Sequence, residues 1–310
     1  MNPFRLAFTA AAFAIGAAAQ EAPKAVLVTG ASSGIGRRVT ERLAEKGYFV
    51  YAGARSQKDL DDLAKLRNVQ PLKLDVTVQA DIDAAVATVT KAGRGLYGIV
   101  NNAGVAVVGP LIELDEKDLD FIFNVNIYGA FRITKAFAPL VIAAKGRVVN
   151  ISSLNGIVTS AFIGPYSMSK HATEAYGDGL AAELGPLGVR VSTIEPGNYG
   201  TEIGKNMLAR LDTTRFKGSR FEQQWRRTVA SMAQFETYPP PDDVADAVFD
   251  AFSSATPRAR YLVVPVAGQA TIALRKLMDE IVQMNDSQKF TLDRDALVRM
   301  LDAAIASARR

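Results

Sequence analysis

The feature that most constrains this chain's fold is a regular alternation of short apolar runs with amphipathic stretches. The apolar runs predict strands over residues 25–29, 48–54, 70–76, 97–101, 147–152, 189–195 and 260–264. The stretches between them predict helices over residues 34–46, 57–66, 79–91, 116–143, 166–184 and 242–252. Repeated strand–helix units with right-handed crossovers indicate an α/β fold, a Rossmann-like doubly wound parallel sheet with helices on both faces.

The alternation lapses over residues 200–240, which are polar and basic and end in Pro239-Pro240-Pro241. An insertion of this kind is typical of a lid over a substrate. The proline run could also mark a domain boundary, but the helix and strand after it can complete the same sheet. We therefore expect a single catalytic domain over residues 24–310, with residues 269–310 forming two helices.

Residues 1–23 differ from the rest of the chain. Arg5 precedes an alanine-rich apolar run over residues 6–19, which ends in small residues. This layout is typical of a secretory signal, and it also suits a membrane-associating segment. A disordered or mis-started extension is the alternative.

Composition excludes several kinds of site. The chain has no cysteine, so it holds no disulfide, thiolate ligand or cysteine nucleophile. His171 is the only histidine, which argues against a histidine-rich metal site, and we expect no metal. The net charge is +4 without a long Lys/Arg run, so we expect no nucleic-acid partner.

The segment Thr29-Gly30-Ala31-Ser32-Ser33-Gly34-Ile35-Gly36 joins the first strand to the first helix. Gly30 allows a sharp turn, Gly34 allows the backbone to approach a pyrophosphate, and Gly36 allows close packing of the helix. Free amides at a helix start favour an anion. The turn therefore predicts a dinucleotide site with contacts from Gly30, Ser32, Ser33, Gly34, Ile35 and Gly36.

The same stretch also satisfies G-x-S-x-G, the nucleophile elbow of α/β-hydrolases, with Ser32 as the nucleophile. A hydrolase would need an acid and a histidine later in the chain. His171 is predicted in the middle of a helix, and the elbow does not normally follow the first strand. We therefore keep the hydrolase as a less favoured alternative.

The end of the second predicted strand bears on the choice between NAD and NADP, since an acid there would bind the ribose hydroxyls of NAD. The chain has Arg55 at this point and no acid between Tyr48 and Lys58. An arginine can bind the extra phosphate of NADP through charge-assisted hydrogen bonds. NADP is expected in preference to NAD.

In Tyr166-Ser167-Met168-Ser169-Lys170 the tyrosine and lysine are four residues apart and share one helix face. With the glycine turn, this pattern resembles the short-chain dehydrogenase/reductase family, in its one-domain branch, over roughly residues 24–200. The further matches are Asp75, Asn101-Asn102-Ala103-Gly104, Asn126, Ser153 thirteen residues before Tyr166, and Pro196-Gly197 followed by Thr201.

Tyr166 is expected to exchange the proton, for which its pKa must fall from about 10 by roughly three units. The Lys170 ammonium and an oxidised nicotinamide ring would both lower that pKa, and Ser153 could hydrogen-bond the substrate oxygen. By resemblance, Asn126 would anchor a water that resupplies the proton. The resemblance also implies cofactor contacts from Asp75, Asn102, Ala103, Gly104, Tyr166, Lys170, Pro196, Gly197 and Thr201.

The expected function is an NAD(P)-dependent oxidoreductase that interconverts a carbonyl and an alcohol on a hydrophobic small molecule. A catalytically silent, NADP-binding regulatory protein is the alternative. By resemblance, a homodimer or homotetramer would form through the long helices around Asn126 and Tyr166. The cofactor favours a cytoplasmic catalytic domain, membrane-associated or not, while the N-terminus leaves export open.

Overall fold

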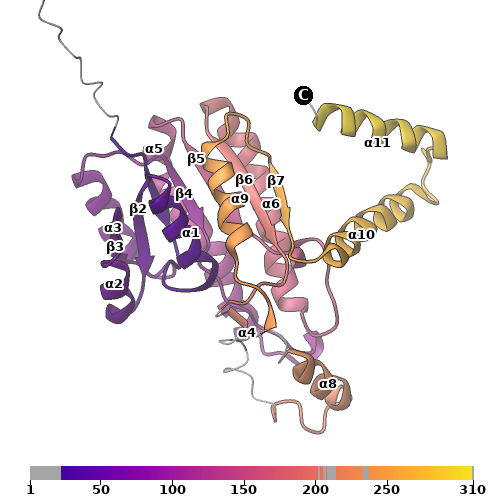
Figure 1. Cartoon of the computed structure of the whole chain (residues 1–310). Helices are drawn as coiled ribbons and strands as arrows, with labels where there is room; N and C mark the ends of the chain where they lie inside the picture. The colour runs from indigo at the N-terminus through magenta and orange to yellow at the C-terminus, as the bar shows by residue number, and fades with distance from the viewer. Residues whose placement is uncertain (1–21, 202, 205–206, 208–213, 233–236, 309–310) are drawn as a thin grey trace, which may run out of the picture.

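The computed structural model describes residues 22–201, 203–204, 207, 214–232 and 237–308 (Figure 1). Within them the core is a seven-stranded, wholly parallel sheet of order β3-β2-β1-β4-β5-β6-β7. The strands are β1 (Ala25–Val28), β2 (Phe49–Ala54), β3 (Val69–Lys73), β4 (Gly98–Asn101), β5 (Arg147–Ile151), β6 (Arg190–Pro196) and β7 (Arg260–Val263). The expected doubly wound, Rossmann-like sheet is confirmed.

Helices cover both faces of this sheet (Figure 1). The α-helices within the described residues are α1 (Gly34–Glu45), α2 (Gln57–Leu63), α3 (Gln79–Lys91), α4 (Glu116–Phe123), α5 (Ala130–Ala143), α6 (Gly164–Leu184), α8 (Glu222–Met232), α9 (Asp242–Ser253), α10 (Ala267–Asn285) and α11 (Arg294–Ala308). Val39 of α1 and Val248 of α9 pack with Val26 and Val28 on one face. Phe137 of α5 packs with Leu27 on the other. Burial on both faces explains why the strands are apolar throughout rather than alternating.

The order of the strands reverses between β1 and β4, which lie side by side although β2 and β3 separate them in the chain. In open parallel sheets, the loops that leave the carboxyl ends of two such strands run in opposite directions and open a crevice. The glycine turn after β1 and the segment after β4 therefore meet at this point.

The helix expected over residues 116–143 has a wider turn in its middle. A π-helical turn, Asn124–Gly129, separates α4 from α5. Asn126 lies in this turn and is 5% exposed. At Gly129, a Cβ would lie 2.6 Å from Cγ2 of Val76, so the turn packs tightly against the end of the sheet. Such turns inside α-helices often occur at functional sites.

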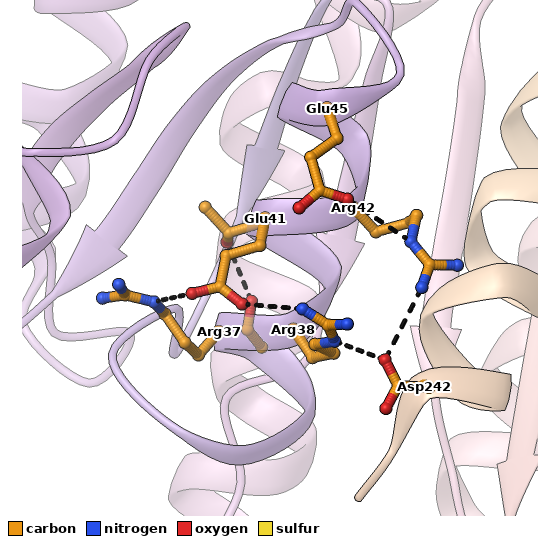
Figure 2. A network of polar contacts seen from close by, with 8 residues as sticks. Arg37, Arg38, Glu41, Arg42, Glu45 and Asp242 are labelled. Atoms are coloured by element: carbon orange, nitrogen blue, oxygen red, sulfur yellow. Dashed lines mark hydrogen bonds and ion pairs between the residues drawn. The ribbon is translucent and has the colours of Figure 1, made fainter.

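A network of polar contacts joins α1 to α9 (Figure 2). Nε of Arg38 lies 2.5 Å from Oδ1 of Asp242, and Arg42 contacts both Asp242 and Asp246. Partly exposed ion pairs contribute at most about 1 kcal/mol each. Their effect is to link the helix that begins at the glycine turn to the first helix after the proline run.

Two parts of the chain lie outside the sheet and its helices. The helices α10 and α11 project from the body (Figure 1), and on them only Gln269 and Ala273 are buried. A small separate core forms around Trp225 of α8, whose ring makes edge contacts with Phe162 and Phe216 at 5.7 and 5.2 Å between centroids. Trp225 therefore packs as a core residue.

Most of the signal-like segment, residues 1–21, lies outside the described residues. Among the helices that the structure describes, none combines the length and apolar character needed to cross a bilayer.

Candidate active site

A cavity of about 820 Å³ opens at the carboxyl ends of the strands, where the strand order reverses. Every residue expected to contact the cofactor lines it: Gly30, Ser32, Ser33, Gly34, Ile35, Gly36, Arg55, Asp75, Asn102, Ala103, Gly104, Tyr166, Lys170, Pro196, Gly197 and Thr201. Ser153 lines it as well. Residues from seven separate segments of the chain are thus brought to one site.

The glycine turn depends on conformations and spaces that other residues would not allow. Gly30 and Gly34 have φ values of 63° and 53°, in the left-handed region that favours glycine. A Cβ on Gly36 would lie 2.2 Å from the carbonyl oxygen of Gly30 and 2.3 Å from Nδ2 of Asn102. Gly36 therefore lets α1 begin close to the turn and to the segment after β4.

Thr29 and Asn102 brace this turn. Oγ1 of Thr29 accepts hydrogen bonds from the backbone N–H groups of Asn102 and Ala103, both at 3.0 Å. In return, Nδ2 of Asn102 donates to the carbonyl oxygens of Thr29 and Gly30, at 2.9 and 3.1 Å. The sequence places Thr29 in the turn but does not indicate that this residue belongs to the site. Its partners lie more than seventy residues away, and no local pattern reveals them.

Arg55 and Asp75 stand together at one end of the cavity. The Arg55 guanidinium lies 3.9 Å from the Asp75 carboxylate and its side chain is 69% exposed. Burial alone would raise the pKa of Asp75, but hydrogen bonds from Thr77 and the charge of Arg55 lower it overall. Asp75 follows β3 instead of lying within the strand as expected, because its carboxylate caps the turn before α3 through Thr77.

Tyr166 and Lys170 lie one turn apart on α6 and face the cavity with Ser153, which follows β5. The ammonium of Lys170 lies 5.7 Å from the centre of the Tyr166 ring and donates to the carbonyl oxygen of Ile151 at 2.9 Å. A hydrogen bond links the side chains of Tyr166 and Ser153. The expected three-residue cluster is therefore present.

The protein alone shifts the pKa of Tyr166 in the direction opposite to the one its expected role requires. Burial raises this pKa, and the hydrogen bond with Ser153 only partly offsets the rise. Burial also lowers the pKa of Lys170 to about 8, although Glu174 acts to raise it. Both shifts have one cause, since burial penalises the charged form of each group.

Asn126 does not line the cavity and lies one layer behind it. Its amide nitrogen donates to the carbonyl oxygen of Val105 and to Oγ of Ser169, at 3.0 and 2.9 Å, and its amide oxygen accepts from the N–H of Val105 at 2.8 Å. The side chain of Asn126 thus ties the π-helical turn to α6 and to the segment after β4.

Gln269, at the base of α10, supports the loop that follows β6. Its Oε1 accepts a 3.0 Å hydrogen bond from the N–H of Asn198, and a Cβ on Gly197 would lie 2.0 Å from that oxygen. The sequence does not indicate this role for Gln269, because the residue lies in a tail without motifs and its partner is 71 positions away.

The part of the cavity beyond Ser153 and Tyr166 is largely apolar. Its lining includes Val108, Val158, Ile163, Met207, Met232 and Ile272. Ile203, Thr228 and Tyr238 also line it, so described residues of the 200–240 stretch border the cavity. The rest of that stretch, residues 202, 205–206, 208–213 and 233–236, lies outside the described residues.

The hydrolase alternative lacks its base. Ser32 lines the cavity, but His171 does not, and Nδ1 of His171 lies 2.9 Å from the carbonyl oxygen of Ser167 on its own helix. A cofactor fits better. The glycine turn presents Gly30, Gly34 and Gly36 to the cavity, and the N-cap residue of α1, Ser33, leaves the first turn of the helix without a side-chain cap.

Comparisons with known proteins agree with this site. A family model described as short chain dehydrogenase matches residues 24–212. The chain is 35% identical over 265 residues to mitochondrial D-beta-hydroxybutyrate dehydrogenase of Bos taurus, covering 77% of this chain and 76% of that protein. It is 34% identical over 250 residues to NADPH-dependent 3-dehydrocapnine reductase of Ornithobacterium rhinotracheale, covering 77% and 87%.

Among solved structures, a short-chain dehydrogenase from Streptomyces avermitilis superposes with a TM-score of 0.71 at 30% identity. The match covers 85% of this chain and 96% of that one. The family model spans the glycine turn, Ser153, Tyr166 and Lys170 together. The chain therefore belongs to the short-chain dehydrogenase/reductase family, as an oxidoreductase with the family's NAD(P)-binding Rossmann fold.

Proposed function

We propose that this protein is an NADPH-dependent oxidoreductase that interconverts a carbonyl and an alcohol on an uncharged, hydrophobic small molecule. The observation that carries the proposal is the cluster of Tyr166, Lys170 and Ser153 at the wall of a cavity that also contains the glycine turn. The bound cofactor would supply the hydride to the substrate carbon as NADPH, or accept it from that carbon as NADP⁺. The chain's own residues hold the substrate oxygen and move the proton.

In the reducing direction, Tyr166 donates its phenolic proton to the substrate oxygen. Ser153 hydrogen-bonds the same oxygen and stabilises the negative charge that develops on it. Lys170 stays charged at neutral pH, because its pKa is about 8, and its field favours the phenolate that remains. Since burial raises the pKa of Tyr166, the proton is held firmly until the oxygen becomes basic.

Arg55 supports NADPH over NADH. Its guanidinium is exposed at the end of β2 and lines the cavity, so it is free to bind the 2′-phosphate at little desolvation cost. The relative from Ornithobacterium rhinotracheale is named as NADPH-dependent. The nearby Asp75 would contact the adenine, as the family resemblance implies.

The substrate class follows from the apolar end of the cavity. Among the described lining residues the charged ones are Arg55, Asp75 and Lys170, all assigned above to the cofactor and the reacting centre. A carboxylate or phosphate on the substrate would lose its hydration there without gaining a described cation. This favours an uncharged aldehyde, ketone or alcohol over a hydroxy acid.

The direct test is a panel of hydrophobic aldehydes and ketones with NADPH, repeated with Tyr166→Phe. Loss of the proton donor should reduce turnover by about 10²- to 10⁴-fold, while NADPH binding stays within twofold. A catalytically silent regulatory protein would bind NADPH but would not oxidise it in the presence of any member of the panel. Turnover retained by Tyr166→Phe would contradict the assigned mechanism.

We further propose one catalytic domain over residues 24–310, in which the 200–240 stretch covers the substrate, and assembly as a homodimer or homotetramer. Three exposed apolar side chains on or near the long helices support assembly: Tyr128, Phe131 and Met168 are 55%, 48% and 43% exposed.

For location we propose a cytoplasmic catalytic domain, with membrane attachment or export decided by residues 1–23. Mass spectrometry of the mature N-terminus would test that assignment.

A further inference from the structure

Glu174 is a buried carboxylic acid next to the reacting centre that the proposed mechanism does not use. It lies on α6, four residues beyond Lys170, so the two side chains share one helix face. Its side chain is 10% exposed. Buried acids are rare unless they are paired, so its surroundings need an explanation.

The carboxylate of Glu174 is fixed from β7. Arg260 contacts it through one guanidinium nitrogen, and the same nitrogen lies 2.9 Å from Oε1 of Glu195 on β6. The other terminal nitrogen of Arg260 lies 2.7 Å from the exposed carboxylate of Asp178. One partly exposed cation is thus shared among three acids, which leaves the group with a net negative charge.

The second oxygen of Glu174 faces the segment that carries the catalytic serine. A Cβ on Gly156 would lie 2.7 Å from Oε1 of Glu174 and 2.7 Å from Oγ of Ser152. Oγ of Ser152 in turn donates to the carbonyl oxygen of Lys170 at 3.4 Å. The carboxylate therefore lies between the start of that segment and the turn of α6 that carries Lys170.

We propose that Glu174 is a positioning residue for the reaction, an anion held by Arg260 that keeps the neighbouring Lys170 ammonium charged inside the protein. The inference rests on the proposed function, in which Lys170 must stay charged while Tyr166 donates its proton. In this structure the Lys170 ammonium lies near the Tyr166 ring and bonds the Ile151 carbonyl on β5, and Glu174 is the acid one turn further along α6. Arg260, Glu195 and Asp178 act on it through Glu174.

The shifts in pKa agree with this geometry. Burial lowers the pKa of Lys170 to about 8, and Glu174 is the charged neighbour that acts against that fall. Burial and the nearby Glu195 raise the pKa of Glu174 itself, while Ser152 and Arg260 lower it. The contact with Arg260 thus favours the anionic form of Glu174 against the effect of burial.

The experiment measures the pKa of Lys170 directly, by NMR of protein labelled with ¹³C at the lysine Cε. The Lys170 signal is identified by its absence in Lys170→Met. In Glu174→Gln, which keeps the shape but removes the charge, the pKa of Lys170 should fall by about one unit. Glu174→Asp retains the charge and should restore most of that shift. Asp178→Asn, an exposed acid on the same arginine, should leave it unchanged.

An unchanged pKa of Lys170 in Glu174→Gln would overturn the proposal. If that variant does not fold, the wild-type titration decides: the Lys170 signal should show two inflections, the lower one from Glu174, and a single inflection would overturn the proposal. Because this readout needs no substrate, it separates the role of Glu174 from the proposed function. Where turnover is measured, Glu174→Gln should move the alkaline loss of reduction rate to lower pH by the same amount.

Discussion

The Nζ of Lys170 donates a 2.9 Å hydrogen bond to the carbonyl oxygen of Ile151, at the carboxyl end of β5. Because the acceptor is a backbone atom, replacing the side chain of Ile151 would not remove this hydrogen bond. It also satisfies one of the three donors of a buried cation. The ammonium also lies 5.7 Å from the centre of the Tyr166 ring, beside the proposed proton donor.

The first prediction concerns pH. Lys170 is charged below its pKa of about 8 and neutral above it. The rate of carbonyl reduction should therefore be steady from about pH 6 to 7.5 and fall as the pH rises through 8. Tyr166 does not produce this loss, because burial keeps its own pKa above its usual value. Initial rates measured across this pH range test the prediction. Lys170→Gln should have a low rate that shows no fall as the pH rises through 8. A wild-type rate that rises through pH 8 would contradict the assignment.

The second prediction concerns the cofactor. Arg55→Asp replaces the exposed cation with an acid suited to ribose hydroxyls, so preference should move toward NADH by about tenfold or more in the ratio of kcat/KM values. The measurement compares NADPH and NADH with one substrate. Lys58→Asp is the matched control, since it removes an exposed cation on α2 that does not line the cavity. An equal change in both variants would show a general charge effect rather than phosphate binding.

The third prediction concerns the glycine turn. Gly36→Ala would place a methyl group 2.2 Å from the carbonyl oxygen of Gly30, so the turn must distort. We expect a loss of stability of about 1–3 kcal/mol and at least tenfold weaker NADPH binding. Thermal unfolding and fluorescence titration measure the two effects. Gly179→Ala on α6, where a Cβ meets nothing within 4 Å, should instead be neutral or stabilising by up to about 1 kcal/mol.

The fourth prediction concerns assembly. Phe131→Glu places a charge on the exposed apolar face of α5, and it should shift the protein toward the monomer if that face is the contact between copies. Light scattering coupled to size-exclusion chromatography gives the mass. Ile112→Glu is the control, because Ile112 is 78% exposed but lies outside the long helices. Identical masses for the wild type and Phe131→Glu would show that copies of the chain meet through another surface or do not assemble.

Elements with a strong local pattern were predictable from the sequence. The seven apolar runs match the seven strands found within the described residues, with ends that differ by at most three positions. The glycine turn, and Tyr166 with Lys170, were indicated by residue type and spacing, whereas Ser153 was indicated by the family resemblance. Local apolar periodicity and turn residues carry this information directly.

Features that depend on distant contacts were not predictable. The π-helical turn at Asn126 interrupts a stretch whose apolar period is continuous, and only its packing against Val76 and Ser169 reveals it. Gln269 acquires its role through Asn198, and Glu174 through Arg260, 86 positions along the chain. A single sequence contains no pattern that pairs such residues.

The brace between Thr29 and Asn102 has a consequence for the order of events during synthesis. The turn after β1 leaves the ribosome before β4 does, yet its shape depends on a side chain 73 positions later. A nascent chain that ends before β4 therefore lacks the bonds that hold the turn. Cofactor binding should therefore begin only after β1 and β4 have paired. A bound nucleotide would stabilise a partly formed sheet, but it would not initiate the formation of the sheet.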